Sequence, residues 1–264
     1  MLTRFAPSPT GHLHLGHALA AKHAFDFGPC LLRIEDIDHT RCKPEFTQAI
    51  YEDLAWLGFD WPQPVRIQSE HRADYDKVID TLRDKGLLYR CFLTRKDLPS
   101  APYQGPFTPM SEDEQHARIK TGDAFAWRLS LSKCQDFLGD GFTRLSYLEA
   151  GKVERADLTP HGDVVLARKD IGTSYHIAVI HDDAVQNISD VVRGQDLKDQ
   201  TSVHVLLQTL MGWPTPHYHH HSLLMSNDGA KLSKRNQDTT IRSLREAGHS
   251  PQDVLAMACR GIFD

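Results

Sequence analysis

The residues most suited to chemistry on a phosphate lie near the start of the chain, in RFAPSPTGHLHLGH at residues 4–17. A strand that ends in such a proline- and glycine-rich turn and leads into a helix presents free backbone N–H groups and the positive end of the helix dipole. His14 and His17 are three residues apart, so in the first turn of that helix they face the same way and can donate hydrogen bonds to phosphate oxygens. Gly16 leaves room for a base or ribose to approach the backbone. The stretch therefore predicts an anion site.

A second stretch, KLSKR at residues 231–235, carries two lysines three residues apart. Lys231 and Lys234 follow the turn-forming run NDGA, and two such cations on a loop can wrap a triphosphate and neutralise developing negative charge. Each stretch alone also fits a plainer interpretation, as a turn with surface histidines or as a solvated basic loop. The chain has 16 histidines, so a single one means little, and it is the two stretches together that indicate nucleotide chemistry.

The segments around these stretches predict an α/β protein with a doubly wound parallel sheet. CLLRIED at 30–36 is a continuous apolar run that ends in charge, as a buried parallel strand does. The helix after it starts at Pro44, a residue favoured in the first helical turn. Strands and helices alternate as such a sheet requires. They are a strand at 2–6, a helix at 15–27, the strand at 30–36, and helices at 44–59 and 69–86.

From residue 93 to residue 165 this pattern is interrupted. PSAPYQGPFTP is rich in loop-forming residues, and the alternation of Phe125, Trp127 and Leu129 predicts a half-buried antiparallel strand. The α/β pattern is expected to resume with DVVLAR at 163–168. We therefore expect four segments. They are the first half of a nucleotide-binding catalytic domain at 1–92, an inserted α+β subdomain at 93–165, the second half of the catalytic domain at 166–230, and the KLSKR loop with short terminal helices at 231–264.

Composition places the chain among ordinary globular proteins. Of its 264 residues 40% are hydrophobic and 25% are charged, which suffices for a sizeable core. The net charge of −5 excludes a general nucleic-acid coat but allows a local basic surface. No apolar run approaches the roughly 20 residues of a membrane helix, no signal peptide is evident, and five scattered cysteines suit a reducing compartment. We expect a cytoplasmic protein without membrane contact and, since nothing indicates an obligate dimer, a monomer.

With these residues in view, the chain resembles a class I aminoacyl-tRNA synthetase. HLGH is similar to the HIGH signature of that family, and KLSKR is similar to its KMSKS signature. RFAPSPTG, RIEDID, YHIAVIHDD and VVRGQDL, in this order, resemble the catalytic domain of glutamyl-tRNA synthetases over essentially the whole chain, most weakly at 93–165. The glutaminyl enzymes carry Glu and Asn where this chain has Ser8 and Thr10, so glutamate is the expected amino acid. The resemblance implies a Rossmann-type fold whose insertion is an acceptor-binding-like subdomain.

The resemblance also implies a set of residues that bind glutamate. Two arginines on family positions suit its carboxylates, because a guanidinium pairs with a carboxylate in bidentate fashion. Glu35 matches the acid that accepts the α-ammonium group. The full implied set is Arg4, Ala6, Ser8, Glu35, Tyr175 and Arg193. Taken singly, each residue has a plainer explanation, such as a strand-end charge for Arg4 or half of an ion pair for Glu35.

The implied reaction needs no nucleophile from the protein. The glutamate carboxylate attacks the α-phosphorus of ATP, pyrophosphate leaves, and glutamyl-adenylate forms, so catalysis consists of positioning and charge stabilisation. The expected catalytic residues are His14, His17, Lys231 and Lys234. The expected ATP-binding residues are His14, Gly16, His17 and Lys234, with Mg²⁺ on the phosphates and no metal held by protein side chains. A hydroxyl of a nucleic acid then accepts the activated glutamate.

The expected acceptor follows from where the chain stops. Family members that charge tRNA(Glu) continue into a long helical region that reads the anticodon, whereas this chain stops 29 residues after KLSKR and no anticodon-binding domain is expected. A truncated branch, the glutamyl-Q tRNA(Asp) synthetases, activates glutamate without tRNA and transfers it to queuosine in the anticodon loop of tRNA(Asp). GDVVLARKDIGTSYHIAVIHDDA resembles that branch, although Arg235 stands where the branch usually has Gln.

The insertion departs from that branch at its zinc site. The branch commonly carries a C-x-C pair, a tyrosine, and a cysteine four residues further on. This chain keeps Cys91 and Tyr103 but has Leu93 and Phe107 at the other two positions. One thiol and one phenol are too few for a four-ligand structural site, so we expect no structural zinc. For HYHHH at 217–221 a histidine-rich approach to KLSKR is favoured over a metal cluster, because alternation along an extended segment splits the histidines between two faces.

Three other functions remain open from the sequence. They are a minimal glutamyl-tRNA synthetase core that charges tRNA(Glu) with a separate anticodon reader, a different adenylate-forming enzyme with a HIGH-type site, and a catalytically silent tRNA-binding paralogue. RIEDID and VVRG argue against the second. Intact HLGH and KLSKR argue against the third, because a silent protein has no chemical need for both histidines and both lysines.

Overall fold

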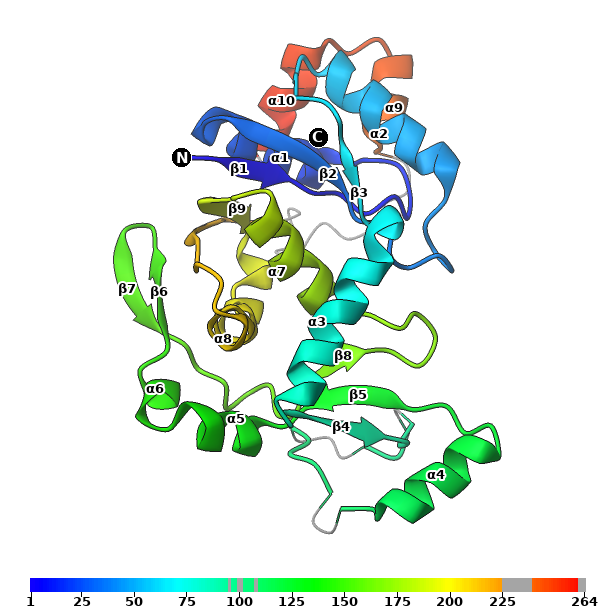
Figure 1. Cartoon of the computed structure of the whole chain (residues 1–264). Coiled ribbons are helices and arrows are strands. Elements are labelled where there is room, and N and C mark those ends of the chain that lie inside the picture. The colour runs from blue at the N-terminus through cyan, green and yellow to red at the C-terminus, as the bar shows by residue number, and fades with distance from the viewer. Residues whose placement is uncertain (95, 99–101, 107–108, 225–238, 261–264) are drawn as a thin grey trace.

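A parallel sheet forms the upper part of the molecule in Figure 1. The structure, a computed structural model, describes residues 1–94, 96–98, 102–106, 109–224 and 239–260. Strands β1 (Thr3–Phe5), β2 (Cys30–Ile34) and β3 (Arg66–Ile67) pair in parallel in the order β1-β2-β3. On the other side of β1 lies β9 (Asp190–Gly194), held there because the N–H groups of Ser189 and Asp190 donate to the Leu2 carbonyl at 3.0 and 3.1 Å. The α/β class predicted from the sequence is confirmed.

β9 belongs to a second sheet of four strands, in the order β7-β6-β10-β9. β10 (His217–His221) pairs in parallel with β9, β6 (Ser146–Glu149) pairs in parallel with β10, and β7 (Lys152–Arg155) closes an antiparallel hairpin with β6. The β6–β7 hairpin belongs to the stretch 93–165, so part of the expected insertion joins the sheet that contains β9 and β10.

Helices near the N-terminal strands carry clear start signals. α1 (Leu15–Phe27) follows β1 and begins after His14, and α2 (Pro44–Trp56) has Pro44 and Glu45 in its first turn, where a missing N–H and a negative charge are favourable. α9 (Ile241–Glu246) and α10 (Pro251–Arg260) lie with α2 at the top of Figure 1, and α10 packs against α1. These helices cover the sheet and hold the turn between β1 and α1.

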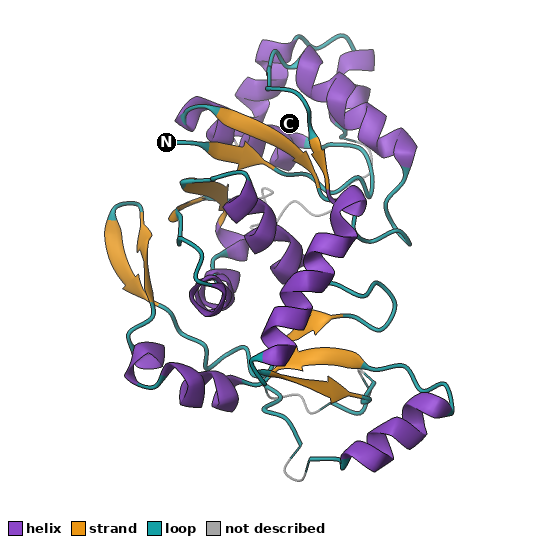
Figure 2. Cartoon of the chain, in the orientation of Figure 1, coloured by secondary structure: helices purple, strands orange, loops and turns teal. Residues whose placement is uncertain are grey.

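A third sheet, which is antiparallel, lies below the others, as the lower group of strands in Figure 2 shows. It consists of β4 (Leu88–Cys91), β5 (Ala126–Leu129) and β8 (Val165–Ala167), in the order β4-β5-β8. The antiparallel strand predicted around Trp127 is confirmed as β5. The expectation that DVVLAR resumes the parallel pattern is wrong, because β8 pairs antiparallel with β5. A short apolar run does not reveal its partner strand, and this sheet extends from Leu88 to Ala167.

Helix α3 (Arg72–Asp84) leads from β3 in the parallel sheet to β4 in the antiparallel sheet in Figure 1 and packs against α7 and α8. The remaining elements are the 3-10 turns Gln68–His71 and Gln195–Leu197, and the helices α4 (Glu112–Lys120), α5 (Leu131–Leu138), α6 (Asp140–Thr143), α7 (Tyr175–Val185) and α8 (Gln200–Met211).

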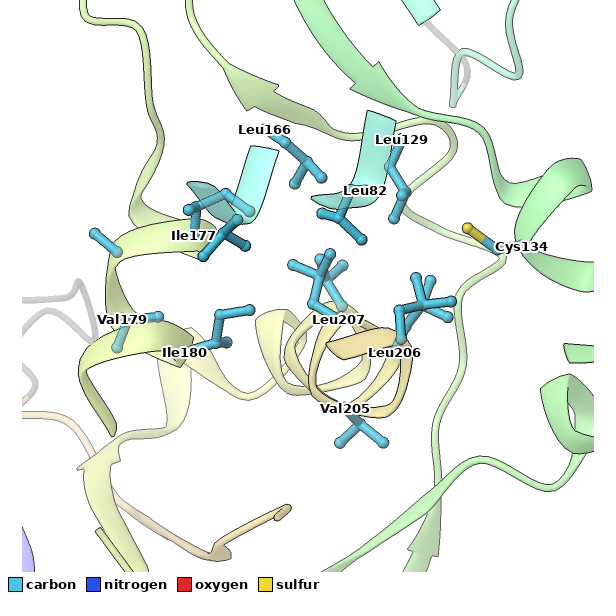
Figure 3. Packing of buried hydrophobic residues seen from close by; sticks show 14 of the residues in the cluster. Leu82, Leu129, Cys134, Leu166, Ile177, Val179, Ile180, Val205, Leu206 and Leu207 are labelled. Carbon is cyan, nitrogen blue, oxygen red and sulfur yellow. The ribbon is translucent and has the colours of Figure 1, made fainter. Parts of the chain in front are cut away.

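Two apolar clusters form the core of the described residues. One is centred on α3, α7 and α8, where Leu82, Ile177 and Leu207 approach one another in Figure 3. The other lies between β2, α1, α2 and α10 and includes Leu32 and Ile50. Because burying each such side chain contributes about 1.5–3 kcal/mol, the two clusters give the strand ends a rigid support.

Candidate active site

The two histidines of HLGH form a pair at the start of α1. His14 is the residue before the helix, and its Nδ1 accepts a hydrogen bond from the Gly16 N–H at 3.1 Å. The Nδ1 of His17 accepts from the His14 N–H at 3.2 Å, and the two ring centroids lie 3.9 Å apart. Because each Nδ1 accepts a backbone proton, each neutral ring carries its own proton on Nε2. The pair can thus present two N–H donors beside the positive end of α1.

Gly16 has a role that the sequence did not suggest. A Cβ atom at this position would lie 2.9 Å from Cε1 and 3.0 Å from Nδ1 of His14. Real Cβ atoms do not approach other atoms so closely, so any side chain at Gly16 would displace the imidazole ring. Gly16 is therefore required for the position of His14, while the approach of a nucleotide to its backbone stays a prediction.

The chain returns to this turn soon after KLSKR. The Ile241 N–H donates to the Leu13 carbonyl at 2.9 Å, and His14 and Thr240 form an isolated antiparallel bridge. This contact brings the described residues that follow KLSKR to the HLGH turn. Lys231, Lys234 and Arg235 themselves lie outside the described residues, and their roles stay predictions.

A cavity of about 110 Å³ opens at the carboxyl ends of β1 and β2. Three sequence-predicted residues line it: Ser8 from the turn after β1, Glu35 directly after β2, and Tyr175 at the start of α7. The Glu35 N–H donates to the Pro7 carbonyl at 3.0 Å, which ties the two strand ends together. Residues separated by up to 167 positions therefore meet in one hollow, as the parallel sheet requires of its strand ends.

Glu35 is a buried carboxyl group with a cationic neighbour. It is 8% exposed, and its Oε1 lies 3.2 Å from Nη2 of the fully buried Arg33. Burial raises the pKa of Glu35, and the guanidinium groups of Arg33 and Arg4 oppose that rise. A carboxylate in this position would gain from a ligand that brings a positive charge into the cavity.

Arg4 is held by a different carboxylate. Its Nε donates to Oδ1 of Asp183 at 2.9 Å, and Nη1 of Arg33 donates to the same oxygen at 2.8 Å. The predicted glutamate ligand is thus part of a buried ion-pair group beneath the cavity. Arg33 and Asp183 were not predicted to have a function. The signal was present, because a charged residue inside the apolar run CLLRI needs a buried partner.

Arg193, on β9, has a shell of neutral partners. Its Nε donates to His220 Nε2 at 3.1 Å, its Nη2 donates to Thr201 Oγ1 at 2.8 Å, and its Nη1 lies 3.3 Å from the Tyr175 hydroxyl and 3.4 Å from His204 Nδ1. No ion pair between described residues includes Arg193, although it is only 6% exposed. Since a buried cation needs compensation, this position favours a carboxylate ligand.

The shell of Arg193 keeps its neutral state at physiological pH. Burial, with the positive charge of Arg193, lowers the pKa of His204 well below its ordinary value, and burial lowers the pKa of His176, which bonds His204 at 3.2 Å, to about 4. Burial raises the pKa of Tyr175, so its hydroxyl keeps its proton. The positive charge of Arg193 therefore lies next to Tyr175, a residue of the cavity lining.

The predicted site residues that the structure describes fall into three groups, and Lys231 and Lys234 lie outside the described residues. Those that meet at the start of α1 are His14, Gly16 and His17. Those that line the cavity are Ser8, Glu35 and Tyr175. Those that do not line it are Arg4, Ala6 and Arg193. Arg193 is joined to the lining by its bond to Tyr175.

The histidines of HYHHH divide between the two faces of β10, as predicted. His219 packs on Phe27 at 4.4 Å, and His221 stacks on His23 at the same centroid distance. His220 faces the other way, where its Nδ1 lies 2.7 Å from Glu149 Oε2. Among the described residues no group of three His, Cys, Asp or Glu side chains is placed to hold a metal ion.

The residues at the zinc position of the insertion do not fit a zinc ion. Cys91 is buried, Leu93 is 39% exposed and offers no donor atom, and Phe107 lies outside the described residues. The Tyr103 carbonyl instead accepts from the Asp163 N–H at 2.6 Å. The expected absence of structural zinc stays a prediction.

No helix within the described ranges is both long and apolar enough to cross a membrane.

Comparison with known proteins identifies the family. The family described as tRNA synthetases class I (E and Q), catalytic domain, matches residues 1–121 and 147–263. A glutamyl-Q tRNA(Asp) synthetase of Rhodobacter capsulatus is 40% identical, covering 96% of this chain and 98% of that protein. A glutamate–tRNA ligase of Coprothermobacter proteolyticus is 32% identical over 96% of this chain but only 56% of its own length.

Among solved structures, a glutamate tRNA ligase from Elizabethkingia meningosepticum in complex with its amino acid has a TM-score of 0.76 at 25% identity, covering 98% of this chain and 60% of that one. The agreement therefore holds in sequence and in fold. The HLGH pair, the strand-end cavity and these matches lead to one assignment: the chain is a ligase-type enzyme that belongs to the class I tRNA synthetases (E and Q).

Proposed function

We propose that this enzyme activates L-glutamate with ATP, without needing tRNA, and transfers the glutamyl group to queuosine in the anticodon loop of tRNA(Asp). The observation that carries the proposal is the cavity lined by Ser8, Glu35 and Tyr175 and backed by the buried, carboxylate-free Arg193. An amino acid with an ammonium group and two carboxylates complements a site that combines a buried acid with a buried cation.

The charges of the site residues suggest which group of glutamate each residue would bind. Glu35 would receive the α-ammonium group, because its own pKa is raised by burial and a bound cation would stabilise its charged form. Arg193 would receive a carboxylate, since its present partners are neutral. Arg4 could bind a substrate carboxylate only by giving up its hydrogen bond to Asp183, so we assign Arg4 a structural role beneath the cavity.

ATP would bind against the HLGH turn. The Nε2–H groups of His14 and His17 and the start of α1 would hold phosphate oxygens, and Lys231 and Lys234 would come from the loop that precedes the Thr240 bridge. Mg²⁺, arriving on the ATP phosphates, would supply further charge neutralisation. Attack of the glutamate carboxylate on the α-phosphorus then gives glutamyl-adenylate and pyrophosphate.

The choice of queuosine rests on the relatives. The Rhodobacter capsulatus protein of that name aligns over 98% of its own length, whereas the Coprothermobacter proteolyticus glutamate–tRNA ligase aligns over 56%. The match to the glutamate–tRNA ligase supports a second candidate function, in which the chain is a minimal catalytic core that charges tRNA(Glu).

Two assays test the proposal. Glutamate-dependent exchange of pyrophosphate into ATP, without tRNA, should be observed, and labelled glutamate should be transferred to queuosine-containing tRNA(Asp) but neither to tRNA(Asp) lacking queuosine nor to tRNA(Glu). Transfer to tRNA(Glu) would instead identify an aminoacylating core. Absence of exchange would indicate a silent paralogue and contradict the proposal.

A further inference from the structure

Two consecutive hydroxyl groups on the cavity wall have no hydrogen-bond partner in the part of the chain that the structure describes. Thr173 is 2% exposed and Ser174 is 6% exposed, and both line the cavity. Neither Thr173 Oγ1 nor Ser174 Oγ forms a hydrogen bond with any described residue. A buried hydroxyl left without a partner costs about 1–3 kcal/mol, so these two groups indicate a ligand.

Ser174 also leaves an available structural role unused. It directly precedes α7, where a serine side chain normally accepts a hydrogen bond from the second or third N–H of the helix. Its side chain makes no such bond. The hydroxyl is therefore not explained by the stability of α7, which strengthens the inference that it serves the cavity.

The surroundings of the two hydroxyls define the chemistry of that ligand. Ile37 and Ile171 line the same cavity and provide apolar surface. Asp38, also in the lining, accepts from the Thr40 hydroxyl at 2.6 Å, and this bond, with Arg41, lowers its pKa to about 2. Arg41, Gln68 and Arg168 add polar groups to the same lining. The apolar surface of the isoleucines, beside hydroxyl groups and a carboxylate, complements a small carbon ring that carries hydroxyl groups of its own.

We propose that Thr173 and Ser174 form the acceptor subsite, which binds a cis-diol on a five-membered ring next to the glutamate subsite. The inference rests on the proposed activation of glutamate, because the acceptor hydroxyl must reach the same activated carbonyl, and Ser174 is adjacent in the chain to Tyr175. Such a diol has two sources in RNA, the cyclopentenediol of queuosine and the terminal ribose of a tRNA. The isoleucines favour the carbocycle.

The transfer step balances without a protein nucleophile. One hydroxyl oxygen of the diol forms an ester bond with the glutamyl carbonyl carbon, and the bond between that carbon and the adenylate phosphate oxygen breaks. AMP leaves with the electron pair of that bond, and the hydroxyl proton passes to a phosphate oxygen of AMP. Thr173 and Ser174 would orient the diol and would not react.

Thr173→Val and Ser174→Ala test the subsite with little change in volume. We expect each to lower kcat/KM for transfer about tenfold, the loss of one hydrogen bond to substrate, while pyrophosphate exchange stays within about twofold of wild type. Thr173→Ser should retain transfer. Thr3→Val is the matched control, because Thr3 is another buried threonine whose Oγ1 has no hydrogen-bond partner among the described residues, but it does not line the cavity. Free cis-1,2-cyclopentanediol should inhibit transfer but not exchange, and its trans isomer should inhibit neither.

The outcomes separate this inference from the proposed function. If the wild-type enzyme charges tRNA(Glu) and the variants lose that transfer, the subsite binds the diol of the terminal ribose. The inference is then supported, and the proposed transfer to queuosine is contradicted. If exchange falls together with transfer, the hydroxyls belong to the glutamate or ATP subsite and the inference is wrong. Unchanged transfer in both variants, with wild-type unfolding midpoints, also overturns it.

Discussion

His14 and Gly16 show how closely one side chain of the site depends on its neighbour. Because a Cβ at Gly16 would lie 2.9 Å from His14 Cε1, we expect Gly16→Ala to turn the imidazole away from the phosphates. Pyrophosphate exchange should then fall about a hundredfold, the usual cost of losing one charge-stabilising donor. Gly11→Ala, in the same turn, is the control, since its Cβ would meet nothing within 4 Å. Equal losses in both variants would contradict this account of Gly16.

Under the proposed function, the charge of Arg193 selects the substrate. Arg193→Gln should raise KM for glutamate in the exchange assay about a hundredfold, the scale of removing one partner from a buried charged contact, and leave KM for ATP within about twofold. The exposed Arg83→Gln should change neither constant. A rise in both constants would mean that Arg193 acts through the fold.

At this scale the sequence indicates candidate ligand-binding residues better than it indicates the side chains that position them. Glu35 and Arg193 were predicted from the resemblance to a known family, and both lie at the ends of parallel strands, where ligands commonly bind. Asp183 and the unpartnered hydroxyl of Ser174 were not, because their state depends on groups distant in the chain. Burial and hydrogen-bond partners are set by the tertiary structure, so they cannot be inferred from the type of a residue alone.

Among the elements, α2 carries a buried acid that makes stability depend on pH. Asp53 is 2% exposed, its Oδ2 has no partner among the described residues, and burial raises its pKa to about 6 against the opposing charges of Arg245 and His12. Between about pH 4, the unfolded value, and pH 6 the folded state binds more protons, so stability from this group is lost as pH rises through that window.

Asp53→Asn should therefore remove the loss of folding stability that the ionisation of Asp53 causes as the pH rises. We expect the variant to unfold at a temperature roughly 5 °C above wild type at pH 8 and to show no such gain at pH 4.5, as thermal unfolding would measure. Asp80→Asn, at a surface position on α3, is the control and should follow wild type at both values. A variant less stable than wild type at pH 8 would show that the attraction of Arg245 outweighs burial.

Element types were readable from the sequence, but strand partners were not. The run CLLRI predicted a buried parallel strand because it is apolar on both faces, and β2 is such a strand. DVVLAR carries the same signal, yet β8 joins the antiparallel sheet, since its partner β5 is brought to it by the path of the insertion. Pairing is decided by the whole chain.

At the scale of the whole molecule, the insertion is attached through contacts that need no metal. Asp163, 3% exposed, provides one: its Oδ2 accepts from the Tyr89 hydroxyl and its Oδ1 from the Leu131 N–H, both at 2.9 Å. Its own N–H donates to the Tyr103 carbonyl at 2.6 Å, and Arg128 Nη1 donates to its carbonyl at 2.5 Å. Asp163 thus joins β4, β5, α5 and the segment around Tyr103.

This arrangement predicts a protein whose stability is independent of metal. Elemental analysis should find less than about 0.1 zinc per chain, and EDTA should leave the unfolding midpoint, measured without ATP, unchanged, because one thiol and one phenol cannot complete a zinc site. Asp163→Ala should lower that midpoint by about 4 °C or more and speed proteolysis near Tyr103, since it leaves buried donors unpaired. Asp157→Ala, a variant of an exposed acid, should have little effect. Stoichiometric zinc together with a midpoint that falls on chelation would show that other side chains hold a metal, and that Asp163 is not what secures the insertion.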